Sequence, residues 1–475
     1  MKNFIWAIIE QVGSQLINIL ISLILALFIA PAEFGVFIIV TIIASLSYLF
    51  INLGFGKSLI KKKYPTEDDK NTVFLINFFI AILFSLAILL GSNQIAIFFN
   101  YPDLENYLYW VPIGFLFSSL GQVNLTLLTK ELKFKQIFIA YLLSRILSGA
   151  IAIYLAYNNY GVWSLVVQQI SSSMLQTLFT FYFYNWLPKF YFSKASYREL
   201  SGFSFNVFGT EFINYLVDNL DKLIIGKFLQ QNVLGFYSRA YQLTMLPVQN
   251  FPRVVDKFLF PYLSKEGLSK SDLAEFYVKI IGLVSYILFP IVITFSFVSD
   301  DFVQVVFTED WSPISPLIKI IAISAILVSL AELNTSFFLI TDNSRQLLIC
   351  NVVSRSLAIG FLFPALRYGI EGVVWVMVVS SLLRLILLTY FNMRIVRFSI
   401  KEYFLTIIIT LLIICTSVCL THLFSNLLNF QMSIISLLFK VISILSLYIM
   451  ISYFVRYKQF RLLCDLYLKK VKLFE

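Results

Sequence analysis

The sequence has few charged residues and almost no side chains that bind metals or act as general bases. Charged residues make up 13% of the 475 positions, against about 25% in soluble globular domains. The chain has one histidine, His422, and its four cysteines lack metal-ligand spacing. We therefore expect no metal, no cofactor and no catalytic residues.

Apolar side chains, in contrast, are in excess. They form 59% of the sequence, and the mean hydropathy is +0.85. One water-soluble core cannot bury this much apolar surface, so a bilayer must solvate the rest. The net charge of +10 lies mainly in short loops between apolar runs, as in membrane proteins, and we expect no nucleic-acid partner. Glu10 interrupts the first apolar stretch, which we interpret as a retained span rather than a signal peptide.

Stretches of about 20 mostly apolar residues are long enough to cross a bilayer. Counting them predicts an all-α polytopic membrane protein with about fourteen transmembrane helices. The expected spans are 3–30, 34–60, 72–99, 105–129, 137–157, 162–187, 200–229, 234–260, 273–298, 314–340, 345–366, 371–393, 402–422 and 433–455.

Lysine and arginine gather in one set of alternate connections. The loop with Lys61, Lys62 and Lys63 and the tail after residue 455 belong to this set, whereas the opposite connections contain only Arg367. Basic loops stay in the cytoplasm. This asymmetry predicts a multi-pass protein of the inner (cytoplasmic) membrane with both termini cytoplasmic.

Short motifs recur in the same order at an offset near 200 residues. The pairs are Phe34-Gly35-Val36-Phe37 with Leu234-Gly235-Phe236-Tyr237, Ser144-Arg145 with Ser354-Arg355, and Gly161-Val162 with Gly372-Val373. Two six-helix bundles of the same orientation follow, related by a pseudo-two-fold axis along the membrane normal, with a substrate site at their interface. We expect an N-terminal lobe at 1–199, a C-terminal lobe at 200–397, and two additional helices with a basic cytoplasmic tail at 398–475.

Polar residues at helical spacing mark one face of the span 200–229, and the span 3–30 repeats part of this pattern 200 positions earlier. The two sets are Glu211, Asn214, Asp218, Asp221 and Lys222, and Gln11, Ser14, Asn18 and Ser22. Polar and charged groups inside a membrane usually face a bundle interior or a wet cavity. The plainer alternative is an Asp218–Lys222 pair that stabilises its own helix without a substrate.

Arginines inside the spans add positive charge to this interior. The further substrate-cavity candidates are Arg145, Arg239, Gln249, Arg253, Arg355 and Arg384. The planar guanidinium fork suits a pyrophosphate or a sugar acid. Alternatively, such residues lock helices together or extend their charge to the headgroups.

Four segments together resemble the Wzx-type polysaccharide flippases of the multidrug/oligosaccharidyl-lipid/polysaccharide (MOP) superfamily, and the resemblance covers nearly the whole chain. They are Ala30-Pro31-Ala32-Glu33-Phe34-Gly35, Gly54-Phe55-Gly56, Asp218-Asn219-Leu220-Asp221-Lys222 and Leu234-Gly235-Phe236-Tyr237-Ser238-Arg239-Ala240-Tyr241. The resemblance implies a V-shaped fold and alternating access, with undecaprenyl-pyrophosphate-linked oligosaccharide moved across the membrane for lipopolysaccharide or exopolysaccharide synthesis. Arg239, Asp218 and Asp221 match the family motif.

The same resemblance implies coupling to a proton or sodium gradient, with Glu211, Asp218 and Asp221 as candidate ion sites, and polysaccharide polymerase machinery as a partner. Two other functions remain open. A MATE-like drug antiporter would use Asp218 and Asp221 for its coupling cation. A polymerase or ligase would place reactive groups in a large external loop, and the longest such loop, 299–313, holds four acids but no Lys, Arg or His.

Overall fold

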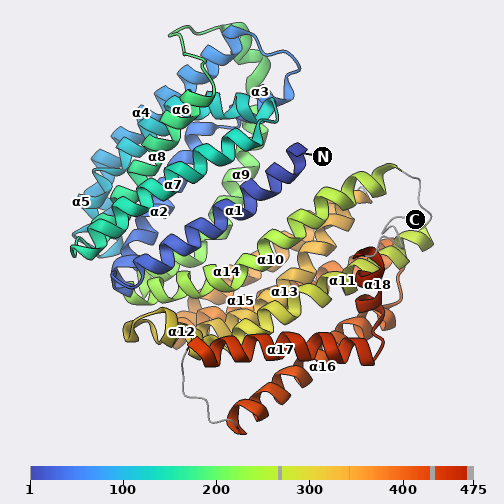
Figure 1. Cartoon of the computed structure of the whole chain (residues 1–475). Coiled ribbons are helices and arrows are strands. Elements are labelled where there is room, and N and C mark those ends of the chain that lie inside the picture. The colour runs from blue at the N-terminus through green and yellow to red at the C-terminus, as the bar shows by residue number, and fades with distance from the viewer. Residues whose placement is uncertain (1, 266–269, 342, 428–433, 468–475) are drawn as a thin grey trace. The chain divides into compact units, whose positions relative to one another are not determined.

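The computed structural model describes residues 2–265, 270–341, 343–427 and 434–467, and the secondary structure in these ranges is helical (Figure 1). Fourteen of the described helices have 20 or more residues, which confirms the predicted all-α polytopic fold. They are α1 (Lys2–Leu25), α2 (Pro31–Asn52), α4 (Glu67–Phe99), α6 (Val111–Lys130), α7 (Phe134–Tyr157), α8 (Val162–Phe183), α9 (Lys194–Phe228), α10 (Gln231–Lys265), α11 (Lys270–Phe297), α13 (Ile314–Ile340), α14 (Ser344–Ala365), α15 (Gly369–Val396), α16 (Ile400–Leu427) and α17 (Ile434–Phe454).

Six short helices connect or follow the long ones: α3 (Phe55–Lys61), α5 (Leu104–Leu108), α12 (Ser299–Val306), η1 (Glu309–Trp311), η2 (Leu366–Tyr368) and α18 (Lys458–Tyr467). Within the described residues, nine segments are apolar and long enough to cross a membrane, and one of these covers both α14 and α15. Of the long helices whose side chains are all described, α8 and α9 fall outside them. Each carries a dense set of polar side chains, as expected for helices that line a polar interior.

The chain forms two compact units, Met1–Gly235 and Phe236–Glu475. In the first, α4 packs on α6, α6 on α8, α7 on α8, and α1 on α7, while α9 packs against α2, α3 and α4. In the second, α11 packs on α13, α13 on α15, and α14 on α15, while α16 lies between α11 and α17. The division by packing therefore falls after α9, whereas the predicted boundary at 199 follows the sequence repeat and stays a prediction.

The packing order supports the internal repeat. The contacts of α4 with α6, α6 with α8 and α7 with α8 recur as α11 with α13, α13 with α15 and α14 with α15. Ser144 and Ser354, which the repeat pairs, are both buried, and each hydroxyl donates to a carbonyl of its own helix. Equivalent segments thus adopt equivalent local structure in the two units.

Helices α2 and α10 meet through a reciprocal backbone contact. A Cβ built on Gly35 would lie 1.9 Å from the carbonyl oxygen of Gln231, and one built on Gly235 would lie 2.0 Å from that of Pro31. The partners Pro31/Gln231 and Gly35/Gly235 are each 200 positions apart, as in the sequence repeat. Only glycine permits this close approach of two backbones.

The turns that contain Gly161 and Gly369 show which residues of the two repeats are equivalent. Gly161 has φ 52° and ψ −127°, and Gly369 has φ 65° and ψ −153°. This backbone region is nearly exclusive to glycine, and a tyrosine precedes both residues. The structure thus pairs Tyr160-Gly161 with Tyr368-Gly369, and the pairing of Gly161 with Gly372 was wrong.

The predicted span 34–60 is also wrong as one helix. Leu53 and Gly54 have φ values of 36° and 73°, which break the helix before α3. A Cβ on Gly54 would lie 2.5 Å from the carbonyl oxygen of Ser204. Lys130 then donates to carbonyls at the end of α3, including that of Ile60 at 2.9 Å. A basic group there complements the helix dipole and fixes α3 beside α6.

Candidate functional site

The polar face of α9 has a graded exposure. Asn214 and Asp218 are exposed, whereas Asp221 and Lys222 are half-buried. The Lys222 ammonium donates to the Asn219 side chain at 3.3 Å. Glu211 forms an ion pair with Lys57 of α3. The face predicted from the sequence is therefore present, but Glu211 is engaged with a neighbouring helix.

Arg145 lies at the middle of α7, as the twelfth of its 24 residues. Its guanidinium stacks over the ring of Tyr141, 4.8 Å from the centroid. Its Nε is buried and has no hydrogen-bond partner among the described residues. The Tyr141 hydroxyl accepts a hydrogen bond of 3.0 Å from the amide of Asn18 in α1. Two of the predicted cavity residues, Asn18 and Arg145, thus both contact Tyr141.

Helices α2 and α8 add polar groups near this arginine. The hydroxyls of Tyr48 and Ser173 are 3.0 Å apart, and Tyr48 is close enough to interact electrostatically with Arg145. The carbonyl oxygen of the Gln169 side chain is buried without a partner among the described residues. Sequence reasoning missed Tyr48, Gln169 and Ser173, although the polar run in α8 was a signal. We call Asn18, Tyr48, Tyr141, Arg145 and Ser173 the Arg145 cluster.

No acidic residue in the described part of the chain forms an ion pair with Arg145. A guanidinium keeps its proton, and so its positive charge, in proteins. At the centre of a membrane helix an arginine costs about 2.5–3.5 kcal/mol on insertion scales. The Arg145 cluster is thus a positive site without a counter-charge, which favours an anionic ligand.

Arg384 in α15 has a different setting. Its Nη1 lies 2.8 Å from a carboxylate oxygen of Glu332 in α13, its Nε donates to Asn351 in α14 at 3.1 Å, and its Nη2 donates to Thr335 at 3.4 Å. The residue was predicted to line the cavity. Its contacts instead join three helices of one unit, so we interpret it as a structural lock.

Breaking this lock is expected to destabilise the protein. Arg384→Met leaves Glu332, whose side chain is 39% exposed, without its ion-pair partner, and we expect a loss of about 1 kcal/mol, at the upper end for a partly exposed pair. Thermal unfolding of the purified protein measures this. The double variant Arg384→Met/Glu332→Leu is expected to regain part of the loss, because neither charge is then left alone. Additive effects of the two substitutions would show that the pair is not coupled.

Arg239 is also more enclosed than a cavity-lining residue would be. It is 5% exposed, its guanidinium lies 5.9 Å from the ring of the fully buried Trp311 in η1, and its Nη1 donates to Gln242 at 3.1 Å. We infer that Arg239 fastens α10 to η1. Among the other candidates, Gln249 is exposed and donates to the Tyr241 hydroxyl at 3.4 Å, and Arg355 is half-buried. The side chain of Arg253 lies outside the described residues.

The acids of the loop 299–313 have lysine partners that the sequence did not suggest. Asp301 is 3% exposed and pairs with Lys440 of α17 at 2.7 Å, and Asp300 pairs with Lys319 of α13 at 2.6 Å. A lone lysine within an apolar helix was the available signal for both partners. Because two of the four acids hold helices together, this loop has less in common with the reactive loop expected of a polymerase or ligase.

The two neighbouring pairs give a matched test of burial. Asp301→Asn is expected to lower the thermal midpoint clearly, since removing one partner of a buried pair costs about 3–5 kcal/mol. Asp300→Asn is expected to change it little, because the Asp300 side chain is 49% exposed and exposed pairs contribute about 0–1 kcal/mol. Thermal unfolding of both variants checks this. Equal losses would contradict the assignment of Asp301 as the buried anchor.

Asp300 should make the stability of the fold fall slightly at acid pH. Partial burial raises its pKa, but hydrogen bonds from Lys319 and Ser315 outweigh this and leave the pKa below its ordinary value. A depressed carboxyl pKa stabilises the fold above the unfolded pKa, and this stabilisation disappears as the pH falls through the folded pKa.

The comparisons with known proteins agree with this architecture. The sequence profile of the family described as "Polysaccharide biosynthesis protein" matches residues 24–316. The chain belongs to this family. Teichuronic acid biosynthesis protein TuaB of Bacillus subtilis (strain 168) is 26% identical over 76% of this chain and 75% of its own length. Lipopolysaccharide biosynthesis protein WzxC of Escherichia coli (strain K12) is 26% identical over 69% and 67%.

Solved structures show the fold of this polysaccharide biosynthesis protein. The lipid II flippase MurJ in its inward closed conformation superposes with a TM-score of 0.74 at 15% identity, over 95% of this chain and 99% of that chain. An inward-facing MATE family transporter of the MOP superfamily gives 0.61 at 13% identity, over 80% and 94%. The predicted membership of a polysaccharide-biosynthesis family is confirmed, and the solved structures confirm the predicted all-helical membrane fold.

Proposed function

We propose that this protein moves a lipid-linked oligosaccharide with an undecaprenyl-pyrophosphate headgroup across the cytoplasmic membrane, for surface polysaccharide synthesis by alternating access. Its family, its flippase-like fold and its relatives TuaB and WzxC support a substrate of this class. The observation that carries the assignment is the Arg145 cluster. Its unneutralised guanidinium lies mid-helix, where a diphosphate would supply the missing negative charge.

The sugar part of the substrate needs a different kind of contact. Asn18, Tyr48, Gln169 and Ser173 offer amides and hydroxyls in the same unit as Arg145. Such groups bind the hydroxyls of neutral sugars through hydrogen bonds. We propose that Arg145 binds the charged headgroup and that the uncharged members of the cluster bind the sugar hydroxyls.

A MATE-like drug antiporter is the second candidate, and its fold similarity is the observation in its favour. A cationic drug would require a negative interior. Arg145 supplies positive charge, and Glu211 is already engaged by Lys57. These contacts favour the anionic substrate. Asp218 and Asp221 stay our candidates for a coupling proton or sodium ion in either case.

We also propose the membrane orientation and the partners. The near absence of basic residues from one set of loops supports cytoplasmic termini. The sequence repeat supports lobes at 1–199 and 200–397, with 398–475 as an appended pair of helices and tail. Polysaccharide polymerase machinery would receive the product on the external side.

Deletion of the gene tests the function in cells. We expect loss of surface polysaccharide, accumulation of lipid-linked units on the inner leaflet, and restoration of both by the wild-type gene. Growth in the presence of toxic organic cations should not depend on the gene. Normal polymer in the deletion strain, together with sensitivity to toxic cations, would favour the antiporter.

A further inference from the structure

A cavity of about 710 Å³ opens between α14 and α15, in the unit that does not contain Arg145. Its lining includes Phe361, Tyr368, Glu371, Trp375, Val379 and Leu383. Most of these side chains are exposed in the isolated chain, Tyr368 at 80% and Trp375 at 47%. The volume lies within the range of small-molecule sites, and the groove has no role in the proposed transport step.

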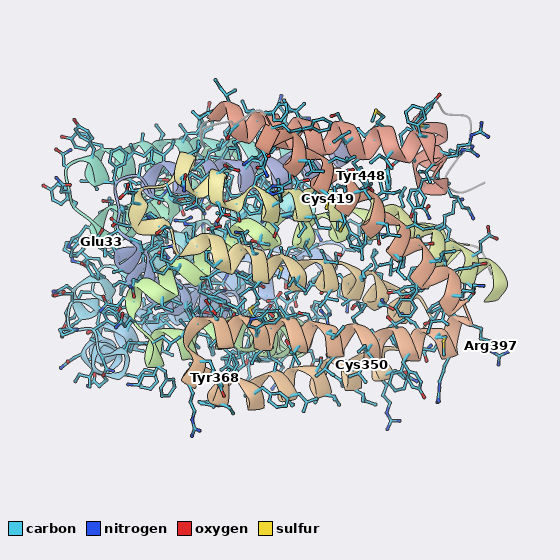
Figure 2. All side chains as sticks on the ribbon, turned by 90° about the horizontal axis from the view of Figure 1, so that it is seen from below. Glu33, Cys350, Tyr368, Arg397, Cys419 and Tyr448 are labelled. Carbon is cyan, nitrogen blue, oxygen red and sulfur yellow. The ribbon has the colours of Figure 1, made fainter. Side chains whose placement is uncertain are left out.

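The length of the groove matches one leaflet of a bilayer. From Tyr368 to Leu383 the helix rises by about 22 Å at 1.5 Å per residue. One leaflet, headgroup included, spans about 20–22 Å. Tyr368 lies toward one end of this unit and Arg397 toward the opposite end (Figure 2). Tyr and Trp prefer the headgroup level, so the Tyr368 end belongs at the interface and the Leu383 end in the hydrocarbon.

The charges at this end select the headgroup. Glu371 lines the groove in the first turn of α15, and Arg367 lies in η2 beside Tyr368. Arg367 is the only basic residue in the predicted external loops. No ion pair of the described residues engages either charge. A carboxylate in the groove repels a diphosphate and attracts an ammonium group, whereas the neighbouring guanidinium attracts a phosphate.

We propose that the groove between α14 and α15 binds one amine-bearing phospholipid, with its acyl chain along Trp375 and Leu383, its ammonium at Glu371 and its phosphate at Arg367. This inference rests on the membrane setting and not on the transported substrate. The orientation proposed above places the bound lipid in the external leaflet. The lipid would fill a gap in the helix surface that side chains leave open.

Lipid retention tests this site. The purified full-length protein is equilibrated with equal amounts of phosphatidylethanolamine and phosphatidylglycerol, and retained lipids are counted by native mass spectrometry. We expect one tightly held phosphatidylethanolamine. Glu371→Gln should lower its retention about fivefold, as for loss of a partly exposed ion pair, and Asp310→Asn, an exposed acid in η1, should not.

Two phenylalanines of α14 allow an experiment to distinguish lipid binding in the groove from general contact with lipid. Phe361 and Phe363 are 52% and 53% exposed, but only Phe361 lines the groove. Phe361→Ala should lower retention, whereas Phe363→Ala should leave it unchanged. Equal retention of both lipids by the wild type, an unaltered Glu371→Gln variant, or equal losses in the two phenylalanine variants would overturn the proposal. Displacement of the amine lipid by a polyprenyl diphosphate would also overturn it and assign the groove to substrate.

Discussion

Replacing Arg145 with alanine is expected to lower export of lipid-linked oligosaccharide by about 10- to 150-fold, with normal amounts of protein in the membrane. Hydrogen bonds to charged groups contribute about 1.5–3 kcal/mol, which corresponds to this range of rates. Because Arg145 has no acidic partner among the described residues, its removal leaves no buried charge behind. Surface polysaccharide per cell, normalised to protein level, measures the effect.

Arg394 provides a matched control. Its guanidinium stacks on Tyr390 four residues earlier at 4.5 Å, as Arg145 stacks on Tyr141 at 4.8 Å. Arg394 is exposed and lies in the last turn of α15. Arg394→Ala removes the same kind of stacking and should leave export unchanged, while Arg145→Lys should give an intermediate rate because the charge stays but the planar fork is lost. Equal export by Arg145→Ala and wild type would refute the headgroup role.

Alanine at Gly35 or Gly235 is expected to reduce folded protein severely. Each new Cβ would lie within 2.0 Å of a backbone carbonyl oxygen, and backbone cannot move aside as a side chain can. Overpacking costs about 1–3 kcal/mol or more, so we expect a fall in thermal midpoint and in the monodisperse fraction after size-exclusion chromatography.

Gly202 and Gly209 of α9 are the controls, because a Cβ at either would meet nothing within 4 Å. Alanine there should be neutral or stabilising by about 0.5–1 kcal/mol, since glycine weakens a helix interior. If alanine at Gly35 were tolerated as well as alanine at Gly209, the close reciprocal contact of α2 and α10 would not exist in the folded protein.

Patterns local in sequence predicted much of this structure. The expected span 314–340 agrees with α13, Ile314–Ile340, because apolar length alone defines it. The expected span 34–60 failed because one tight turn at Gly54 depends on contact with α9, which no local pattern contains. The length of an apolar stretch predicts where a helix lies, whereas a break such as the turn at Gly54 depends on contacts with residues far away in the sequence.

At the candidate site, too, the sequence did not predict contacts between distant residues. Sequence identified Arg145 and Arg384 as similar arginines inside spans, yet only Arg384 is paired with Glu332, 52 positions away. Asp301 and Lys440 are 139 positions apart. Such pairings depend on which helices are neighbours, and a single sequence carries that information only through its repeat. Which of these arginines has an acidic partner therefore had to come from the structure.

Transbilayer movement in proteoliposomes tests the central claim most directly. The vesicles would contain a polyprenyl-diphosphate-linked oligosaccharide with a fluorescent sugar, and an impermeant quencher would report its arrival in the outer leaflet. We predict rapid movement with the wild type and with Arg394→Ala, and movement at least about tenfold slower with Arg145→Ala. Movement no faster than in protein-free vesicles, or Arg145→Ala vesicles as fast as wild type, would contradict a flippase that holds its headgroup at Arg145.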